Sequence, residues 1–338
     1  MFVTETNYNN AIQMKYRTLG NTGFRVSEIG FGAWAIGGAM DVFGMPVGWS
    51  NVTDAESVAA IERAIELGIN FFDTADVYGM GHSEELLGKA LKGKDCIIAT
   101  KVGNHVDEED ARKDFSEKWI RESIEGSLKR LNRDAIDLYQ LHNPDPNAYK
   151  KGEVFDVMNR LKEEGKIRAI GVSISNPKEG LDLIHNHKPD CLQVLFNILN
   201  QEPAKELIPE AKKNRVGIIV RVPLASGLLT GKFRETDRFF SDDNRSNYLT
   251  PQRMKEALNK VERLKQLTSE TGIPLGVVSL AFLLHFEGVS CLIPGAKNPL
   301  QVEQNASASE LKIRDDIIQK IREEFSEYNF YLRYNVTV

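Results

Sequence analysis

The chain has 338 residues, of which 41% are hydrophobic and 27% charged, and its formal net charge at pH 7 is −5. This composition is that of an ordinary globular protein, and the slight acidic excess excludes a global basic field that would attract nucleic acid or an anionic membrane. No run of about 18 apolar residues is present, so we expect no membrane-spanning helix. An anionic ligand would therefore need a local basic site.

The N-terminus and the cysteines indicate the compartment. Residues 1–14 lack the apolar core of a signal peptide, so we expect a loose extension before a single domain over 15–338. Met14 is an alternative candidate for the first residue. The three cysteines are far apart, form no C-x-x-C pair and each begin an apolar run, which is typical of buried thiols in a reducing cytoplasm. They are Cys96, Cys191 and Cys291.

Short apolar runs alternate along the chain with stretches of helical periodicity. The tripeptide Asn21-Thr22-Gly23 predicts a hairpin near the N-terminus. Beyond this hairpin, strands are expected at 28–33, 69–73, 96–100, 136–141, 168–173, 191–196, 216–222 and 290–294. Helices are expected at 83–91, 177–186, 203–213, 253–269, 274–286, 299–306 and 311–326.

Further helices are marked by apolar residues spaced three or four positions apart. One contains Val58 and follows a capping box formed by Thr53 and Glu56, and the others cover 120–131 and 154–161. The alternation of eight strands with helices predicts an α/β protein with a single-domain (β/α)8 TIM-barrel fold, an N-terminal β-hairpin and extra C-terminal helices. The alternative, a doubly wound sheet, more often has about five to seven strands.

The stretch IGFGAWA at 29–35 fits the dinucleotide fingerprint G-x-G-x-x-G/A. In a Rossmann fold this loop passes directly into a helix whose N-terminus meets the phosphates. Here a glycine-rich loop follows, and helical periodicity resumes only near Thr53. We therefore expect the match to be accidental. In a barrel, the same position is the carboxyl end of the first strand, where active sites form.

Polar side chains fall at or just beyond the ends of three successive predicted strands. Asp73 closes the second strand, and Tyr78 follows five residues later. Lys101 and His142 come directly after the third and fourth strands. Because the strands of a barrel end at one mouth, we expect these side chains to converge there.

This combination favours the reduction of a carbonyl group. Tyr78 is too weak an acid in water to donate a proton efficiently, and a nearby ammonium from Lys101 would lower its pKa. Asp73 would neutralise the buried Lys101, and His142 would orient the substrate oxygen or help to relay the proton. A Schiff-base mechanism with Lys101 as nucleophile is the alternative chemistry. No metal-ligand spacing is present, so no metal site is expected.

Longer segments resemble the aldo-keto reductases over about residues 15–328, and most of all the microbial branch related to potassium-channel β subunits. The segments that carry this resemblance are GINFFDTADVYGMGHSEELLG (68–88), ATK (99–101), IDLYQLHNPDP (136–146), IGVS (170–173), PLASGLLTGKF (223–233) and IPGAKNPLQVEQN (293–305). The resemblance implies that Tyr78 donates a proton to the carbonyl while a nicotinamide supplies the hydride. It also implies that Asp73 and Lys101 tune Tyr78 and that His142 positions the substrate.

The resemblance places an extended nicotinamide dinucleotide across the barrel mouth. Its carboxamide would be held at Ser173 and Gln193 and its pyrophosphate by segment 223–233. The implied substrate pocket consists of Trp34, Tyr78 and His142. The implied cofactor-binding positions are Ala33, Trp34, Asp73, Ser173, Gln193, Arg221, Pro223, Leu224, Ser226, Gly227, Lys232, Gly295, Lys297, Gln301, Gln304 and Asn305.

Three positions depart from the family pattern. Ile174 stands where many members have Asn, and Arg221 stands where many have an aromatic residue stacked on the nicotinamide. Gln301 replaces an Arg that often binds the adenosine 2′-phosphate, and Lys297 is a candidate substitute for it. We therefore expect NADP(H) to be favoured over NAD(H).

Several features leave alternatives open. Segment 231–248 either folds over the pyrophosphate as a belt or is a solvated loop. Trp49 and segment 104–116 either wall the substrate pocket or pack at its rim. The aromatic tail 327–338 docks on the barrel or on another subunit, so the oligomeric state is open. We expect a small carbonyl compound as the partner, with no nucleic acid and no membrane, and a cofactor-bound sensor or regulatory subunit is the alternative function.

Overall fold

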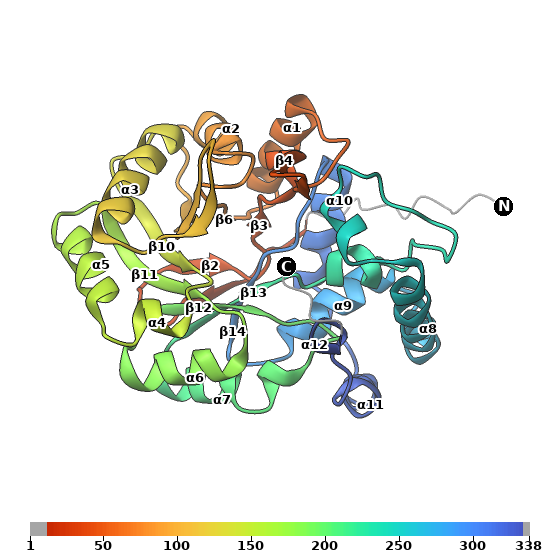
Figure 1. Cartoon of the computed structure of the whole chain (residues 1–338). Helices are drawn as coiled ribbons and strands as arrows, with labels where there is room; N and C mark the ends of the chain where they lie inside the picture. Colours follow the sequence, from red (N-terminus) through yellow and green to blue (C-terminus); the bar gives the residue numbers. More distant parts are fainter. Residues whose placement is uncertain (1–11, 334–338) are drawn as a thin grey trace.

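Parallel strands form a barrel at the centre of the protein (Figure 1). The structure is a computed structural model that describes residues 12–333. Each strand is parallel to its neighbours, which confirms the predicted (β/α)8 fold. In spatial order the strands are β3 (Phe31–Gly32), β6 (Phe71–Asp73), β7 (Ile97–Val102), β10 (Ile136–His142), β11 (Ile167–Ser173), β12 (Cys191–Leu195), β13 (Gly217–Arg221) and β14 (Val289–Leu292).

The barrel closes where β3 meets β14. The amide of Gly30 donates to the carbonyl oxygen of Leu292 at 2.7 Å, and the amide of Gly32 donates to Pro294 at 3.1 Å. A Cβ atom on Gly32 would lie 2.5 Å from a backbone carbonyl oxygen just after β14, so this approach requires glycine. The glycines of the fingerprint-like stretch thus close the barrel. A single 3-10 turn, η1 (Ala35–Gly37), follows them instead of an α-helix.

A hairpin closes the opposite end of the barrel. Its strands, β1 (Tyr16–Thr18) and β2 (Arg25–Ser27), are antiparallel, as the Asn-Thr-Gly signal between them predicts. Leu19 and Val26 of this hairpin are fully buried and pack against side chains inside the barrel. Because this end is plugged, the open mouth lies at the carboxyl ends of the strands.

Helices surround the barrel (Figure 1). The predicted capping box is present, since the Thr53 hydroxyl accepts from the amide of Glu56 and donates to its carboxylate at 2.8 Å. The helices are α1 (Asp54–Glu66), α2 (His82–Ala90), α3 (Glu117–Leu131), α4 (Pro146–Tyr149), α5 (Glu153–Glu163), α6 (Pro177–Asn186), α7 (Leu207–Asn214), α8 (Pro251–Thr268), α9 (Leu275–Leu284), α10 (Pro299–Ala306), α11 (Asp315–Phe325) and α12 (Phe330–Arg333). Within residues 12–333 no single helix could cross a membrane, and α8 and α9 reach the necessary length and apolarity only as a pair bent by 86°.

Both ends of the described chain pack on the barrel. Met14 is 9% exposed and joins the hydrophobic core, so the expectation of a loose extension up to residue 14 is wrong at its end. Residues 1–11 lie outside the described part. At the other end, the Phe330 amide donates to the carbonyl oxygen of Leu199 at 3.0 Å, and the Phe330 and Tyr331 side chains are buried. The described part of the aromatic tail therefore docks on the barrel.

The cysteines follow the prediction with one exception. Cys191 and Cys291 are buried, whereas Cys96 is only partly buried. Cys96 precedes β7 and lies at the end of the barrel rather than inside it. Its sulfur accepts a hydrogen bond from the Arg133 guanidinium at 3.3 Å, although the residue stays partly exposed.

Two hairpins near the barrel mouth escaped prediction. β4 (Met40–Val42) pairs with β5 (Met45–Val47) in the loop after β3. β8 (Asn104–Val106) pairs with β9 (Ala111–Lys113) in the loop after β7. These strands have three residues each. An alternation that short cannot be told from an irregular loop in the sequence.

Segment 231–248 crosses toward the first of these hairpins. The Asn244 amide donates at 3.0 Å to the carbonyl oxygen of the residue before Trp49. The Arg245 guanidinium lies 4.4 Å from the Trp49 ring centroid and 4.5 Å from that of Phe239, a cation–π arrangement. The segment therefore forms a strap whose second part, over 239–248, packs beside Trp49, while most residues of 231–242 are exposed.

Gly88 makes a close contact between α2 and α3. A Cβ atom there would lie 2.2 Å from the carbonyl oxygen of Arg130 and 2.8 Å from the backbone of Leu131. We expect Gly88→Ala to lower the free energy of unfolding by about 1–3 kcal/mol, because the backbone of α3 must move. Denaturant unfolding followed by circular dichroism measures this. The matched control is Gly276→Ala in α9, where the nearest atom is 3.7 Å away and no loss is expected; equal losses would contradict the steric argument.

Candidate active site

Asp73, Lys101 and Tyr78 form a hydrogen-bonded chain at the barrel mouth. Asp73 ends β6, Lys101 lies in β7, and Tyr78 lies in the loop after β6. Lys101 Nζ donates to Asp73 Oδ1 at 2.5 Å, to the Thr74 carbonyl oxygen at 2.7 Å and to Tyr78 Oη at 3.1 Å. The three predicted residues are thus brought together, and each proton of the ammonium has an acceptor.

Two glutamines hold the other carboxylate oxygen of Asp73. Gln140 of β10 donates from Nε2 to Asp73 Oδ2 at 3.0 Å, and Gln193 of β12 donates at 2.7 Å. Both glutamines are buried. Sequence reasoning missed Gln140, because its position within an apolar strand gives no sign that its amide faces the carboxylate. Together these bonds fix the orientation of Asp73.

Burial and charge act in opposite directions on the pKa values of this chain. Burial lowers the pKa of Lys101, but Asp73 and Tyr78 outweigh it, so the pKa lies above its usual value. Burial raises the pKa of Tyr78, and the opposing effect of the Lys101 ammonium is smaller. Lys101 lowers the pKa of Tyr78, as expected, but burial outweighs this effect and leaves the pKa above its usual value. The phenol remains protonated at neutral pH.

His142 ends β10 and faces Tyr78, with the two ring centroids 5.9 Å apart. Burial lowers its pKa well below the usual value, and the charges of Lys101 and Lys113 lower it further, so the imidazole is neutral at neutral pH. The Asn104 side chain lies with Nδ2 2.8 Å from His142 Nδ1. When the amide nitrogen donates to Nδ1, the ring carries its proton on Nε2, which is then a donor.

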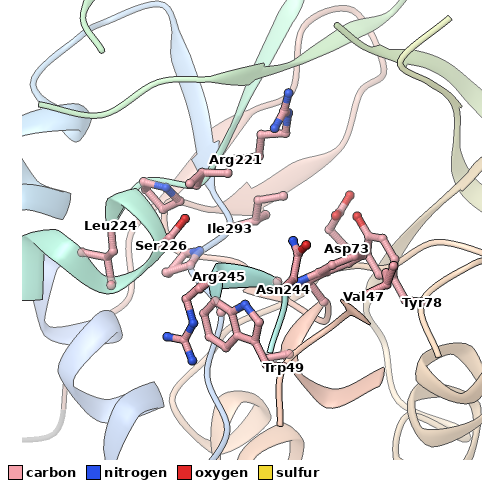
Figure 2. A pocket seen from close by; sticks show the side chains of 18 of the residues that line it. Val47, Trp49, Asp73, Tyr78, Arg221, Leu224, Ser226, Asn244, Arg245 and Ile293 are labelled. Atoms are coloured by element: carbon pink, nitrogen blue, oxygen red, sulfur yellow. The ribbon is translucent and has the colours of Figure 1, made fainter. Parts of the chain in front are cut away.

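A cavity of about 680 Å³ begins at these residues and extends across the barrel mouth (Figure 2). Asp73 and Tyr78 lie on one side of it, and Leu224 and Ser226 lie on the opposite side. Trp49, from the loop after β5, lies between these two sides. Trp49 therefore walls the cavity rather than packing only at its rim.

The cavity lining contains nearly all the predicted site residues. Lys101 is absent from it because the lysine is buried behind Tyr78. Ala33, another predicted cofactor-binding position, is the other exception and does not line the cavity. Its side chain is fully buried in the core, since successive residues of an extended chain point to opposite sides. Gly32 and Trp34 line the cavity instead.

Segment 222–227, after β13, contains several residues with left-handed backbone. Val222, Ala225 and Ser226 have φ of 53°, 49° and 57°, and Gly227 has φ of 94°. Such conformations are strained for residues other than glycine and mark functional sites. A right-handed residue followed by a left-handed one, as at Leu224 and Ala225, turns successive N–H groups toward one point where an anion can bind. Because most of this segment lines the cavity, its backbone fits a pyrophosphate.

The far end of the cavity carries a cation. It is lined by Lys297, Gln301, Gln304 and Asn305, from the loop after β14 and from α10. Lys297 Nζ donates to the carbonyl oxygen of Ser50 at 2.6 Å. Burial lowers the pKa of Lys297, as expected for an ammonium bonded to a neutral acceptor. This end could therefore hold the adenosine part of a dinucleotide and has a cation for a phosphate attached to it.

Ile174 and Arg221, which depart from the family pattern, contact each other. Arg221 Nη2 donates to the Ile174 carbonyl oxygen at 3.3 Å, and the guanidinium lines the cavity. Asn143, which also lines the cavity, accepts from Ser173 Oγ at 2.8 Å through its side-chain oxygen. Sequence reasoning missed Asn143, although segment 136–146 contains it. Asn143 thus places a side-chain amide beside Ser173, whereas Ile174 has no side-chain amide.

The model of the Aldo/keto reductase family matches residues 28–324 of the chain. The chain is 37% identical over 300 residues to the aldo-keto reductase YhdN of Bacillus subtilis, covering 86% of this chain and 87% of that protein. The chain belongs to the aldo/keto reductase family. It is also 31% identical over 328 residues to the NADH-specific methylglyoxal reductase of Escherichia coli, covering 92% of this chain and 98% of that protein.

Two further relatives confirm the predicted branch and the barrel. A probable voltage-gated potassium channel subunit beta of Oryza sativa subsp. japonica is 29% identical over 332 residues, covering 91% of this chain and 95% of that protein. The structure of the aldo-keto reductase AKR11C1 of Bacillus halodurans, in its holo form, matches with a TM-score of 0.76 at 29% identity, covering 92% and 96%. Members of the family are oxidoreductases that act on carbonyl or alcohol groups with nicotinamide cofactors, and this chain is one of them.

Proposed function

We propose that this aldo/keto reductase reduces aldehydes or ketones to alcohols with NADP(H), and that Tyr78 is the proton donor. The observation that carries the proposal is the position of the Lys101 ammonium, bonded to both Asp73 and Tyr78 at one end of the cavity. A neutral phenol beside a buried cation is an acid whose conjugate base is stabilised at the moment it forms.

The nicotinamide, when bound, supplies a hydride. Tyr78 Oη donates its proton to the carbonyl oxygen of the substrate, and the Lys101 ammonium stabilises the phenolate that remains. His142 donates from Nε2 to the same oxygen and orients it, because Asn104 holds Nδ1. The Trp34 ring, 4.7 Å from the Tyr78 ring, helps to exclude water from the reacting groups.

The structure gives no support to Lys101 as a Schiff-base nucleophile. A nucleophilic amine must be neutral and must have its lone pair free. Lys101 instead donates to three acceptors, and its pKa is raised rather than lowered. We therefore assign it the role of tuning Tyr78.

The side chains present fit a dinucleotide along the cavity. Ser173 and Asn143 would hold the carboxamide, together with Oε1 of Gln193, since the Nε2 atom of Gln193 is bound to Asp73. Segment 222–227 would bind the pyrophosphate through its backbone. The planar Arg221 guanidinium would face the nicotinamide in place of the usual aromatic ring. The strap over 231–248 would then cover the pyrophosphate.

We infer a preference for NADPH from the charges at the adenosine end. In Rossmann folds, a carboxylate commonly binds the ribose 2′-hydroxyl of NAD. Here the carboxylate of Asp243 is bound by the Arg245 guanidinium at 2.8 and 2.6 Å. Lys297 donates to a neutral carbonyl and can accept a phosphate as partner. A 2′-phosphate therefore meets a cation rather than a repelling carboxylate.

Replacing Lys297 with Met is expected to weaken NADPH binding about tenfold and to leave NADH binding within about twofold. The loss of one charge-assisted hydrogen bond corresponds to about 1.5 kcal/mol, and only NADPH carries the 2′-phosphate. Titration of each cofactor, followed by quenching of tryptophan fluorescence, measures both affinities. NADH is the internal control, and an equal loss for the two cofactors would place Lys297 away from the 2′-phosphate.

A panel of simple aldehydes and ketones tests the proposed function directly. With NADPH deuterated at the transferable position of the nicotinamide, we expect deuterium on the carbinol carbon of the product and loss of the reduced-cofactor absorbance. Tight NADPH binding without turnover across the panel would favour a cofactor-bound sensor or regulatory subunit. The similarity to a probable potassium channel β subunit is the observation that favours this alternative.

A further inference from the structure

We propose that the substrates of this enzyme carry an anionic group, a carboxylate or a phosphate, and that Lys113 binds that group. The proposal rests on the proposed carbonyl reduction and names the class of carbonyl compound. It follows from the position of one lysine on a hairpin that the catalytic chemistry does not use.

Lys113 lies at the end of β9, paired in register with Asn104 of β8. Its Nζ donates to the backbone carbonyl oxygen of His142 at 2.7 Å, while Asn104 contacts the His142 ring. Both hairpin residues line the cavity. The hairpin therefore places an ammonium group beside the residue that orients the substrate carbonyl.

The charges of the cavity leave Lys113 as a cation for the substrate. Among the described residues that line the cavity, the only carboxylate is Asp73, and it is bound to Lys101. The other cations that line the cavity are Lys232, Arg245 and Lys297 at the cofactor end, and Arg221, which donates to the Ile174 carbonyl oxygen. Lys113 comes from a different loop, the one after β7, and adjoins His142 instead. A negative charge on the substrate would thus meet a cation and no free carboxylate.

The ammonium of Lys113 also lacks a bonded counter-ion. Within residues 12–333 it donates to a carbonyl oxygen and to no carboxylate. Partial burial lowers its pKa to about 8, although Asp76 and Asp145 oppose that shift. Burial raises the pKa of Asp76 itself to about 8, so this neighbour carries little charge at neutral pH. A bound anion would supply the missing charge and would stabilise the ammonium.

A purely structural role for Lys113 makes a different prediction. If the lysine served only to hold the backbone of His142, its loss would lower kcat for every substrate alike. A role in binding raises KM selectively for anionic substrates. Matched pairs of aldehydes separate the two, and suitable pairs are succinic semialdehyde with butanal and para-carboxybenzaldehyde with para-tolualdehyde.

The experiment compares kcat/KM for these pairs in the wild type, in Lys113→Gln and in Arg112→Gln. In Lys113→Gln we expect the anionic-to-neutral ratio to fall about tenfold, mainly through KM, as for the loss of one charge-assisted contact. Arg112 lies on the same strand, bonds to Asp110 and does not line the cavity, so Arg112→Gln should keep the wild-type ratio. An unchanged ratio in Lys113→Gln overturns the proposal.

Two further readouts complete the test. In the wild type the anionic-to-neutral ratio should fall as the pH rises through about 8, because Lys113 loses its proton and the facing Asp76 loses its own. Asp145 also faces Lys113, and the neutral His142 does not change charge in that range. Binding of benzoate, measured by calorimetry, should weaken about tenfold in Lys113→Gln whether or not aldehydes are reduced. If the wild type reduces no aldehyde or ketone of the panel, the proposed function fails, and benzoate binding still decides the role of Lys113.

Discussion

Replacing Tyr78 with Phe is expected to lower kcat for aldehyde reduction about 1000-fold, within the usual range for loss of a general acid. The phenyl ring keeps its edge contact with Trp34, so the walls of the cavity stay in place. The ammonium of Lys101 loses one acceptor but keeps its bonds to Asp73 and to a backbone carbonyl. Steady-state rates, followed by oxidation of NADPH, measure the effect.

The affinity for NADPH separates a chemical effect of this substitution from a structural one. Because the hydroxyl is assigned to the substrate oxygen, the Kd of NADPH should change by no more than about twofold. Undiminished turnover in Tyr78→Phe would remove Tyr78 from the proton-transfer step. A parallel loss of NADPH binding would show instead that the cavity has changed shape, and the kinetic result would then say nothing about the acid.

The sequence supports the barrel and the central site because both depend on topology. Eight single strands alternating with helices have few three-dimensional solutions, and their carboxyl ends must meet at one mouth. Asp73, Lys101 and His142 lie at those ends, so their convergence follows from strand order alone. Tyr78 lies five residues beyond β6 and stays at the same mouth.

Features that depend on loop conformation or on burial escaped prediction. Asn104 and Lys113 sit on a hairpin whose three-residue strands leave no periodic signal, yet both contact His142. The direction of the Tyr78 pKa shift depends on the balance between burial and the Lys101 charge, which only the three-dimensional structure supplies. The Ala33 side chain points into the core because successive residues of an extended chain point to opposite sides, and its neighbours Gly32 and Trp34 line the cavity.

Replacing Lys101 with Met is expected to lower kcat about 100-fold and also to destabilise the fold. The ammonium stabilises the phenolate of Tyr78, so its loss raises the pKa of Tyr78 further above the usual value. In the reverse reaction, oxidation of an alcohol with NADP+, Tyr78 must accept a proton. The pH at which this oxidation becomes fast should therefore shift upward, which a pH–rate profile measures.

Destabilisation and loss of catalysis must be separated in this variant, because Lys101→Met leaves the buried Asp73 carboxylate without its cation. Breaking a buried ion pair from one side costs about 3–5 kcal/mol, while removing both charges costs much less. We expect the double variant Asp73→Asn/Lys101→Met to recover most of the stability measured by thermal unfolding but none of the lost kcat. Recovery of both together would mean that Lys101 acts only through folding. Recovery of stability alone assigns the ammonium to the proton transfer itself, because Tyr78 then lies in an intact site without the charge that stabilises its phenolate.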